Sequence, residues 1–115
     1  CDYASLENQR VFTTVDGQGA PDGSCIDAQG FLWNAEWGGS RVVRYALDGR
    51  VDRVIESPCA QTTCPVLAGP GYSTLYSTSA RMGLDKPTDA DGALIKAEAV
   101  VAAGLPEVRL TGRLN

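Results

Sequence analysis

Short apolar runs separated by turn residues dominate this chain. Asp-Gly pairs and a Gly-Pro-Gly triplet recur between the runs. Thirteen Gly and six Pro interrupt the apolar segments, which favours many short strands over long helices. The pattern therefore predicts an all-β fold. The turn signals are at residues 16–17, 22–23, 48–49, 69–71 and 91–92.

The clearest local element is a β-hairpin. Residues 41–46 and 50–56 are strand-like, and the Leu47-Asp48-Gly49 turn separates them. An Asp-Gly pair supplies the positive φ angles that tight hairpin turns require. We therefore expect these two segments to pair antiparallel.

An internal repeat indicates the architecture. Residues 31–38 align with residues 74–81 at a spacing of 43 residues. Four-stranded propeller blades repeat every ~40–50 residues, so the spacing predicts a β-propeller. The expected division of this single partial propeller domain is outer strands of one blade in 1–15, a full blade in 22–58 and a last blade in 59–113.

Composition narrows the possible partners. The 115-residue chain is 43% hydrophobic, which is ordinary for one globular domain. No run of about 18 apolar residues predicts a membrane span. The first residues lack the basic and apolar regions of a signal peptide, so we expect a cytoplasmic protein. The net charge is −4 and the ten basic residues are scattered, which argues against nucleic acid as a partner.

The reactive residue types exclude several kinds of catalysis. The chain has no His, which removes Ser-His-Asp and Cys-His machinery and every His-based zinc site. Oxygen-ligand metal chemistry is then the main remaining route to hydrolysis. Cys25 lies in a strand-like run and is expected to be buried. Cys59 and Cys64 are expected as free thiols, although an oxidising compartment would permit a disulfide between them.

One stretch carries a family resemblance. A Pro21-Asp22-Gly23 turn is followed by Asp-x-x-Gly-x-Leu-Trp at 27–33 and by Gly-Gly-x-Arg-Val at 38–42. This combination resembles the C-terminal part of the gluconolactonase/regucalcin (senescence marker protein) family, and the similarity continues along nearly the whole chain. The resemblance implies about two and a half four-stranded antiparallel blades of a six-bladed propeller. Asn34 differs from the aliphatic residue that the family usually has there.

The resemblance bears on one ambiguous segment. Residues 93–103 are rich in Ala and have high helix propensity, so they are helical by local criteria. The family pattern instead implies a strand, a loop and a final strand near residues 108–110. We expect the strand arrangement.

The resemblance also implies an activity. Members of the family hydrolyse lactones with one divalent cation, for which calcium is the first expectation and zinc, manganese or magnesium are alternatives. Asp22 corresponds to a metal ligand of the family and is also a candidate catalytic base. The other family ligands have no counterpart in this sequence. One carboxylate does not satisfy Ca²⁺ or Mg²⁺, which take about six to eight oxygens.

The expected lactonase is therefore competent only when another chain or copy supplies the absent blades. The expected partners are a complementary N-terminal half or further copies in a homo-oligomer, and a lactone or sugar-like small molecule. The alternative is a non-catalytic binding module derived from a propeller.

Meander topology predicts which residues share a face with Asp22. Strands of a blade run alternately away from and toward one face, so the start of the first strand lies near the end of the second. The expected pocket wall combines Asp22 with Glu36, Trp37, Thr63, Ser79 and Arg81. Four of these residues have a structural alternative: Asp22 is a common turn residue, Trp37 is equally a packing residue, and Glu36 and Arg81 are typical of surface or structural charges.

Overall fold

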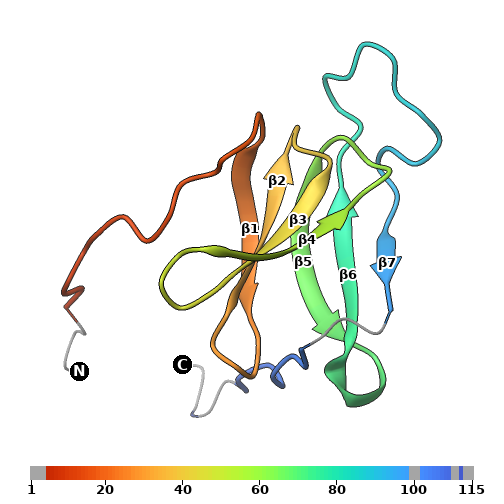
Figure 1. Ribbon diagram of the computed structural model, residues 1–115. Coiled ribbons are helices and arrows are strands. Elements are labelled where there is room, and N and C mark those ends of the chain that lie inside the picture. The colour runs from red at the N-terminus through yellow and green to blue at the C-terminus, as the bar shows by residue number, and fades with distance from the viewer. Residues whose placement is uncertain (1–4, 99–101, 110–111, 113–115) are drawn as a thin grey trace.

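Two antiparallel sheets make up the protein (Figure 1). The computed structural model describes residues 5–98, 102–109 and 112. The sheets have the orders β1-β2-β3-β4 and β5-β6-β7, so each is a simple meander. The strands are β1 (Ala20–Ile26), β2 (Leu32–Trp37), β3 (Arg41–Tyr45), β4 (Val51–Glu56), β5 (Thr62–Ala68), β6 (Thr74–Ser79) and β7 (Ile95–Ala97), with one 3₁₀ turn, η1 (Pro70–Tyr72).

The all-β prediction is confirmed, and the hairpin and the repeat lie where the sequence places them. Strands β3 and β4 pair antiparallel, and Gly49 between them has a φ of 84°. The repeated residues form β2 and β6, which are the second strands of their sheets. The described residues contain no helix of the length and apolar character that crossing a membrane requires.

Two segments differ from the simplest propeller pattern. Residues 5–15 contain no strand, whereas outer strands of a blade are expected there. An outer strand is held by its ladder to inner neighbours, and no such neighbours pair with this segment. Among the described residues, one long-range hydrogen bond of this segment runs from Thr13 Oγ1 to the Gly49 carbonyl oxygen (2.7 Å), in the turn between β3 and β4.

Residues 93–98 settle part of the helix-or-strand alternative. Strand β7 pairs with β6 from Ile95 to Ala97, so sheet pairing overrides the helix propensity there. Residues 99–101 lie outside the described part of the chain. Residues 108–109 form no strand, in contrast to the expected final strand near 108–110, and residue 110 is not among those described.

The core lies between the two sheets. Successive side chains of a strand point to opposite faces, so Trp33 and Ala35 of β2 face the second sheet while Asn34 and Glu36 face away from it. Trp33 is fully buried. The core residues are Trp33, Ala35, Val42, Leu67, Leu75 and Ala102.

The turn between β1 and β2 is built on Asp27. One carboxylate oxygen accepts bonds from the backbone N–H groups of Gln29 (2.9 Å) and Phe31 (3.1 Å). The other oxygen accepts from Trp33 Nε1 (2.9 Å) and Arg44 Nε (2.9 Å). The turn and the core are therefore joined through one buried carboxylate.

Polar contacts also join the two sheets. The Thr62 hydroxyl on β5 donates to the Arg41 carbonyl oxygen (2.9 Å) and accepts from the Glu36 N–H (3.1 Å). At the opposite end, the C-terminal segment crosses both sheets. Ala28 N–H donates to the Ala103 carbonyl oxygen, and Gly104 N–H donates to the Tyr72 carbonyl oxygen, each at 2.8 Å. Both ends of the interface are thus held by hydrogen bonds.

The described cysteines are unpaired, in line with the expected free thiols. Cys59 is buried and its thiol donates to the Ala90 carbonyl oxygen (2.9 Å). Cys64 is exposed, whereas Cys25 is half-buried rather than fully buried. Burial, followed by the nearby Cys64 and Asp27, raises the pKa of Cys25 to about 11.

Candidate functional site

Asp22 lies on a β-bulge at the start of β1. Pro21 pairs with Glu36 and Ser24 pairs with Asn34, so Asp22 and Gly23 together oppose the single residue between those partners on β2. A bulge bends its strand and redirects the side chains it carries. The Asp22 side chain is exposed, and no described residue forms a hydrogen bond or an ion pair with its carboxylate. This carboxylate does not cap its own turn and is available to a ligand.

Gly23 brings the bulge against the second sheet. A Cβ atom on Gly23 would lie 2.7 Å from the Thr63 carbonyl oxygen and 2.8 Å from Cys64 Sγ. Only glycine permits this approach, because such distances are shorter than any ordinary contact. The first strands β1 and β5 are therefore adjacent at the position of Asp22, and Thr63 lies close to it. The Thr63 hydroxyl shares a 2.6 Å hydrogen bond with the Thr78 hydroxyl.

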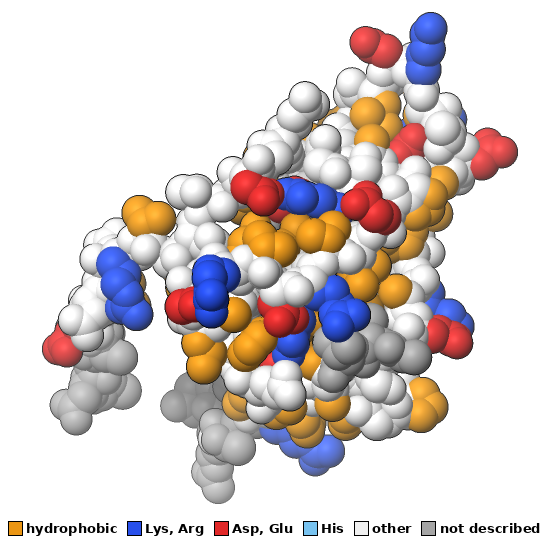
Figure 2. All heavy atoms as spheres, in the orientation of Figure 1, with side chains coloured by type: hydrophobic (Ala, Val, Ile, Leu, Met, Phe, Trp, Pro, Cys, Tyr) orange, Lys and Arg blue, Asp and Glu red, His pale blue; other side chains and the backbone are white. Residues whose placement is uncertain are grey.

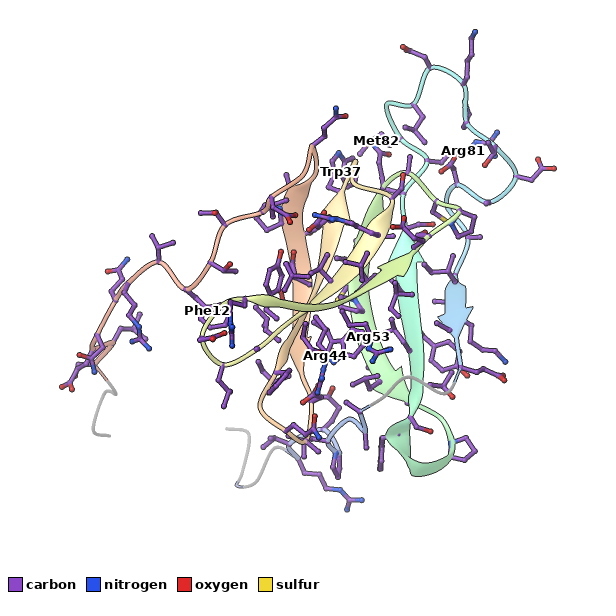
Figure 3. The ribbon with its side chains drawn as sticks, in the orientation of Figure 1. Phe12, Trp37, Arg44, Arg53, Arg81 and Met82 are labelled. Atoms are coloured by element: carbon purple, nitrogen blue, oxygen red, sulfur yellow. The ribbon has the colours of Figure 1, made fainter. Side chains whose placement is uncertain are left out.

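The strand register places the other candidates at the same end of the sheets. Trp37 pairs with Ala20, and Ser79 pairs with Thr62. Figure 3 shows Trp37 and Arg81 at this end, together with Met82. Arg81 is exposed and forms no ion pair with a described residue. Trp37 is half-buried.

Two of the candidates are occupied by structural contacts. Glu36 is fully buried, and its Oε2 and Oε1 accept from Arg41 Nε (2.6 Å) and Nη2 (3.2 Å). Ser79 Oγ donates to the Ala93 carbonyl oxygen (2.6 Å) and accepts from the Gly92 N–H (3.1 Å). Glu36 thus corresponds to the structural alternative that the sequence left open, and Ser79 secures the loop after β6.

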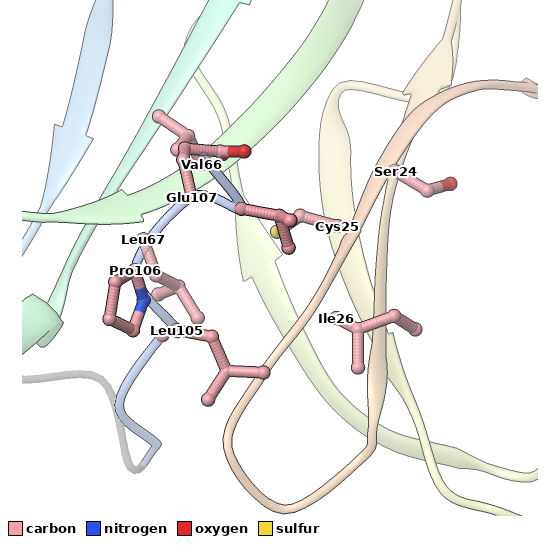
Figure 4. Close-up of a pocket in the computed structure, with 10 residues that line it drawn as sticks. Ser24, Cys25, Ile26, Val66, Leu67, Leu105, Pro106 and Glu107 are labelled. Atoms are coloured by element: carbon pink, nitrogen blue, oxygen red, sulfur yellow. The ribbon is translucent and has the colours of Figure 1, made fainter. Parts of the chain in front are cut away.

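Two cavities adjoin the first strands, and no described cavity collects all six candidates. A cavity of about 520 Å³ lies beside Asp22, between residues 12–15 and the outer face of the first sheet, and its wall includes Asn34 and Tyr45. A second cavity, of about 320 Å³, lies between β1, β5 and the C-terminal segment (Figure 4). Cys25 and Glu107 line the second cavity. Trp37, Thr63, Ser79 and Arg81 line neither.

Asn34 is a functional candidate that sequence reasoning missed. It is 5% exposed, and its side-chain amide donates to the carbonyl oxygen of Asp22 (3.0 Å) and to Ser24 Oγ (2.8 Å). The available signal was a polar residue between the apolar residues Trp33 and Ala35 in a predicted strand. In the sequence, Asn34 stands out only as a departure from the family pattern.

The charged side chains on the surface are distributed as the scattered basic residues of the sequence predict. On the face shown in Figure 2, Lys and Arg side chains are scattered and several stand beside acidic ones. Among the described residues, Arg50 pairs with Asp48, and both side chains are exposed. This face lacks the clustered basic residues that a phosphate backbone requires.

The acidic and thiol side chains of the described residues offer few ligands to a divalent cation. Within the described residues, no three His, Cys, Asp or Glu side chains come together as a metal site. The unpaired Asp22 carboxylate does fit one position of a hard cation, since such ions prefer oxygen ligands. The remaining positions need donors from outside this set.

Comparison with known proteins gives the family. Residues 1–81 match the family model described as SMP-30/Gluconolactonase/LRE-like region. An L-arabinolactonase of Azospirillum brasilense is 47% identical over 79% of this chain and 31% of its own length. The pentonolactonase XacC of Haloferax volcanii is 34% identical over 93% of this chain and 39% of its own length.

Solved structures agree. A calcium-binding regucalcin of Agrobacterium tumefaciens superposes with a TM-score of 0.74 at 39% identity, over 88% of this chain and 36% of that protein. A luciferin-regenerating enzyme gives a TM-score of 0.80 at 28% identity, over 92% of this chain and 38% of that protein. The chain spans about a third of the length of these relatives. The two sheets are therefore blades of a partial β-propeller, and the chain belongs to the SMP-30/gluconolactonase/LRE-like family.

Proposed function

We propose that this chain supplies the C-terminal blades of a metal-dependent lactone hydrolase. The observation that carries the proposal is the Asp22 carboxylate, which is exposed, unpaired among the described residues and displaced by a bulge. Exposed carboxylates at turns normally bond nearby backbone N–H groups. Membership of a family with relatives named L-arabinolactonase and pentonolactonase supports lactones as the substrate class.

Asp22 has two roles in this proposal. It provides one oxygen ligand to a divalent cation, and its carboxylate is the candidate base for the attacking water. When bound, such a cation supplies Lewis-acid chemistry at a carbonyl oxygen. Calcium is the first choice, because the structure from Agrobacterium tumefaciens is named calcium-binding. Zinc, manganese and magnesium are the alternatives.

Two other side chains support substrate binding in the proposal. Arg81 is an exposed cation in the loop after β6, and Thr63 of β5 lies next to the bulge on β1. A lactone offers a carbonyl oxygen and ring hydroxyls to such donors. Trp37, which is half-buried at the same end, offers an apolar surface to a sugar-like ring. These groups orient substrate, whereas Asp22 belongs to the reacting centre.

The cation needs further ligands, so the proposal includes an assembly. A hard cation takes about six to eight oxygens, and the described residues bring no three acidic or thiol side chains together. We assign the remaining ligands to complementary N-terminal blades, since the relatives are about three times as long as this chain. Ring closure by further copies of the chain is the competing outcome.

The experiment compares the assembled protein, in which this chain is joined by the complementary blades, with its Asp22→Asn variant. Proton release measures hydrolysis of a pentonolactone with calcium and after chelation. Asp22→Asn should abolish calcium-dependent hydrolysis while thermal unfolding is unchanged. Asp48→Asn is the matched control, because Asp48 also precedes a glycine in a turn and lies at the end of the first sheet opposite to Asp22.

Unchanged hydrolysis in Asp22→Asn would overturn the proposal. The alternative, a non-catalytic binding module, would be favoured if the chain stays a 12.1 kDa monomer, does not associate with complementary blades and binds no calcium. Native mass spectrometry makes that distinction and also separates N-terminal blades from additional copies as the completing unit.

A further inference from the structure

The bulge that carries Asp22 needs a stabilising contact for its backbone. Within a regular ladder, Asp22 and Gly23 would each pair with β2, but the register shift leaves both without a ladder partner there. Unpaired backbone carbonyl groups in a partly buried strand cost free energy unless another donor reaches them. The question is which group serves as that donor.

Asn34 is the donor. Its Nδ2 atom lies 3.0 Å from the Asp22 carbonyl oxygen and 2.8 Å from Ser24 Oγ, with the Gly23 carbonyl oxygen at 3.4 Å. A side-chain amide has two N–H groups, so it satisfies two of these acceptors well. The opposite amide orientation would place Oδ1 against two carbonyl oxygens, so the neighbours determine the orientation.

The position of Asn34 is costly unless it serves the bulge. The residue is 5% exposed, and Oδ1 has no hydrogen-bond partner among the described residues. An apolar residue of similar size would avoid this unpaired buried oxygen. Asn34 also lines the 520 Å³ cavity that reaches Asp22. The amide is thus retained in a buried strand where only its contacts with the bulge use its polarity.

We propose that Asn34 is a positioning residue that holds the Asp22–Ser24 bulge and thereby fixes the direction of the Asp22 carboxylate. Glycine at position 23 sets the contact of the bulge with β5, and Asn34 fixes the same bulge from β2. The inference deepens the proposed function and rests on Asp22 as a cation ligand. Groups that orient a metal ligand typically change metal affinity 10–100-fold when removed.

The first test examines the bulge itself and needs no metal. Two-dimensional ¹H–¹⁵N spectra of the 115-residue chain are compared for the natural sequence and Asn34→Leu, whose side chain has the same number and branching of heavy atoms but no donors. Backbone resonances of Asp22, Gly23 and Cys64 should shift, and the amide of Ser24 should exchange faster with solvent. The resonance of Asp27 should stay in place. Unchanged bulge resonances would overturn the inference.

The second test measures calcium binding by titration calorimetry in the protein assembled with complementary blades. Asn34→Leu should raise the Kd at least about tenfold, with a thermal midpoint close to that of the natural sequence. Ser77→Ala is the matched control: Ser77 is buried on β6, and its hydroxyl donates to the Thr78 carbonyl oxygen, away from the bulge. This control should leave the Kd unchanged.

The variants separate the two ideas. If Asp22→Asn abolishes calcium binding and Asn34→Leu leaves the Kd unaltered, positioning by Asn34 is wrong and the proposed function stands. If Asp22→Asn binds calcium normally, the proposed function is wrong, and the spectra alone decide whether Asn34 holds the bulge. Should Asn34→Leu not fold, Asn34→Asp replaces it, because it keeps the size and turns an acceptor toward the Asp22 carbonyl oxygen. The expected rise in Kd is the same.

Discussion

Trp33 Nε1 donates a 2.9 Å hydrogen bond to Asp27 Oδ2, and both residues are almost fully buried. The same carboxylate oxygen accepts from Arg44, whose guanidinium also lies 4.0 Å from the ring centroid of Phe31. A charged turn residue is in this way built into the hydrophobic core. The first sheet depends on it for the β1–β2 turn and for the orientation of its largest side chain.

Removal of this carboxylate should be among the most damaging single changes. Asp27→Ala leaves Arg44 and the Trp33 indole without a buried acceptor. Loss of one partner from a buried ion pair costs about 3–5 kcal/mol. Urea unfolding followed by tryptophan fluorescence measures the loss. Asp52→Ala serves as the comparison, since it removes a more exposed partner of Arg44 and should cost less than about 1 kcal/mol.

Acid should weaken the fold through Asp27. Burial alone would raise the pKa of Asp27, but hydrogen bonds from Arg44, Trp33 and the turn N–H groups outweigh it and hold the pKa below its usual value. The unfolded chain has an aspartate pKa of about 3.9. The stabilisation is therefore complete above about pH 5 and is lost as the pH falls through 4 toward the folded pKa.

Thermal midpoints between pH 7 and pH 3 test this dependence. Asp27→Asn should have a lower midpoint at pH 7 and a smaller drop on acidification than the natural sequence. Equal drops in both proteins would assign the acid sensitivity to other carboxylates, such as Asp16 and Asp91, whose pKa values are also lowered.

Glu36→Gln distinguishes a structural residue from a pocket residue. The change removes the charge that faces Arg41 at 2.6 Å, and hydrogen bonds to charged groups contribute about 2 kcal/mol. We expect a stability loss of this size and an unchanged calcium Kd in the assembled protein. A large change in Kd with unchanged stability would return Glu36 to the wall of the pocket.

Gly23→Ala should separate the first strands of the two sheets. The added methyl group would collide with the Thr63 carbonyl oxygen and with Cys64 Sγ, and overpacking of this kind costs about 1–3 kcal/mol. Chemical denaturation measures the effect. Gly38→Asn is the control: Gly38 has open space around it, and its φ of 78° is one that asparagine tolerates.

The thiols should differ in reactivity. Cys25 has its pKa raised to about 11, mainly by burial, and thiolate is the reactive form. Cys64 is exposed. Iodoacetamide at pH 8 should therefore label Cys64 well before Cys25, as read from peptide masses over time. The Cys25 rate should climb as the pH approaches 11, and comparable rates at pH 8 would contradict the described burial.

The sequence predicted the strands better than the site, for a physical reason. Turn chemistry and the alternation of apolar and polar residues are local. The hairpin with its turn at Gly49 and the repeat that forms β2 and β6 could therefore be predicted from short stretches of sequence. The short strand β7 did not follow from local propensity, because its conformation is decided by pairing with β6. An Ala-rich segment does not show in its own sequence which strand it pairs with.

The candidate site could be predicted from the sequence only in part. Alternation and meander topology placed Trp37 and Ser79 at the correct end of the sheets, since register follows from the turns. They could not show that Glu36 points into the ion pair with Arg41 rather than toward a pocket. Asn34 was missed because a bulge displaces the strand register by one residue. The residues around Asp22 do not show that the bulge forms, nor which residue of β2 donates a hydrogen bond to its carbonyl oxygens.

The crossing of the C-terminal segment has a consequence for how the protein unfolds. Residues 103–104 bond to the first sheet through Ala28 and to the second through Tyr72, while Thr62 ties the sheets at their other end. Neither sheet can open without breaking bonds that also belong to the other. The two blades should therefore behave as one cooperative unit, with a single calorimetric transition whose van't Hoff and calorimetric enthalpies coincide.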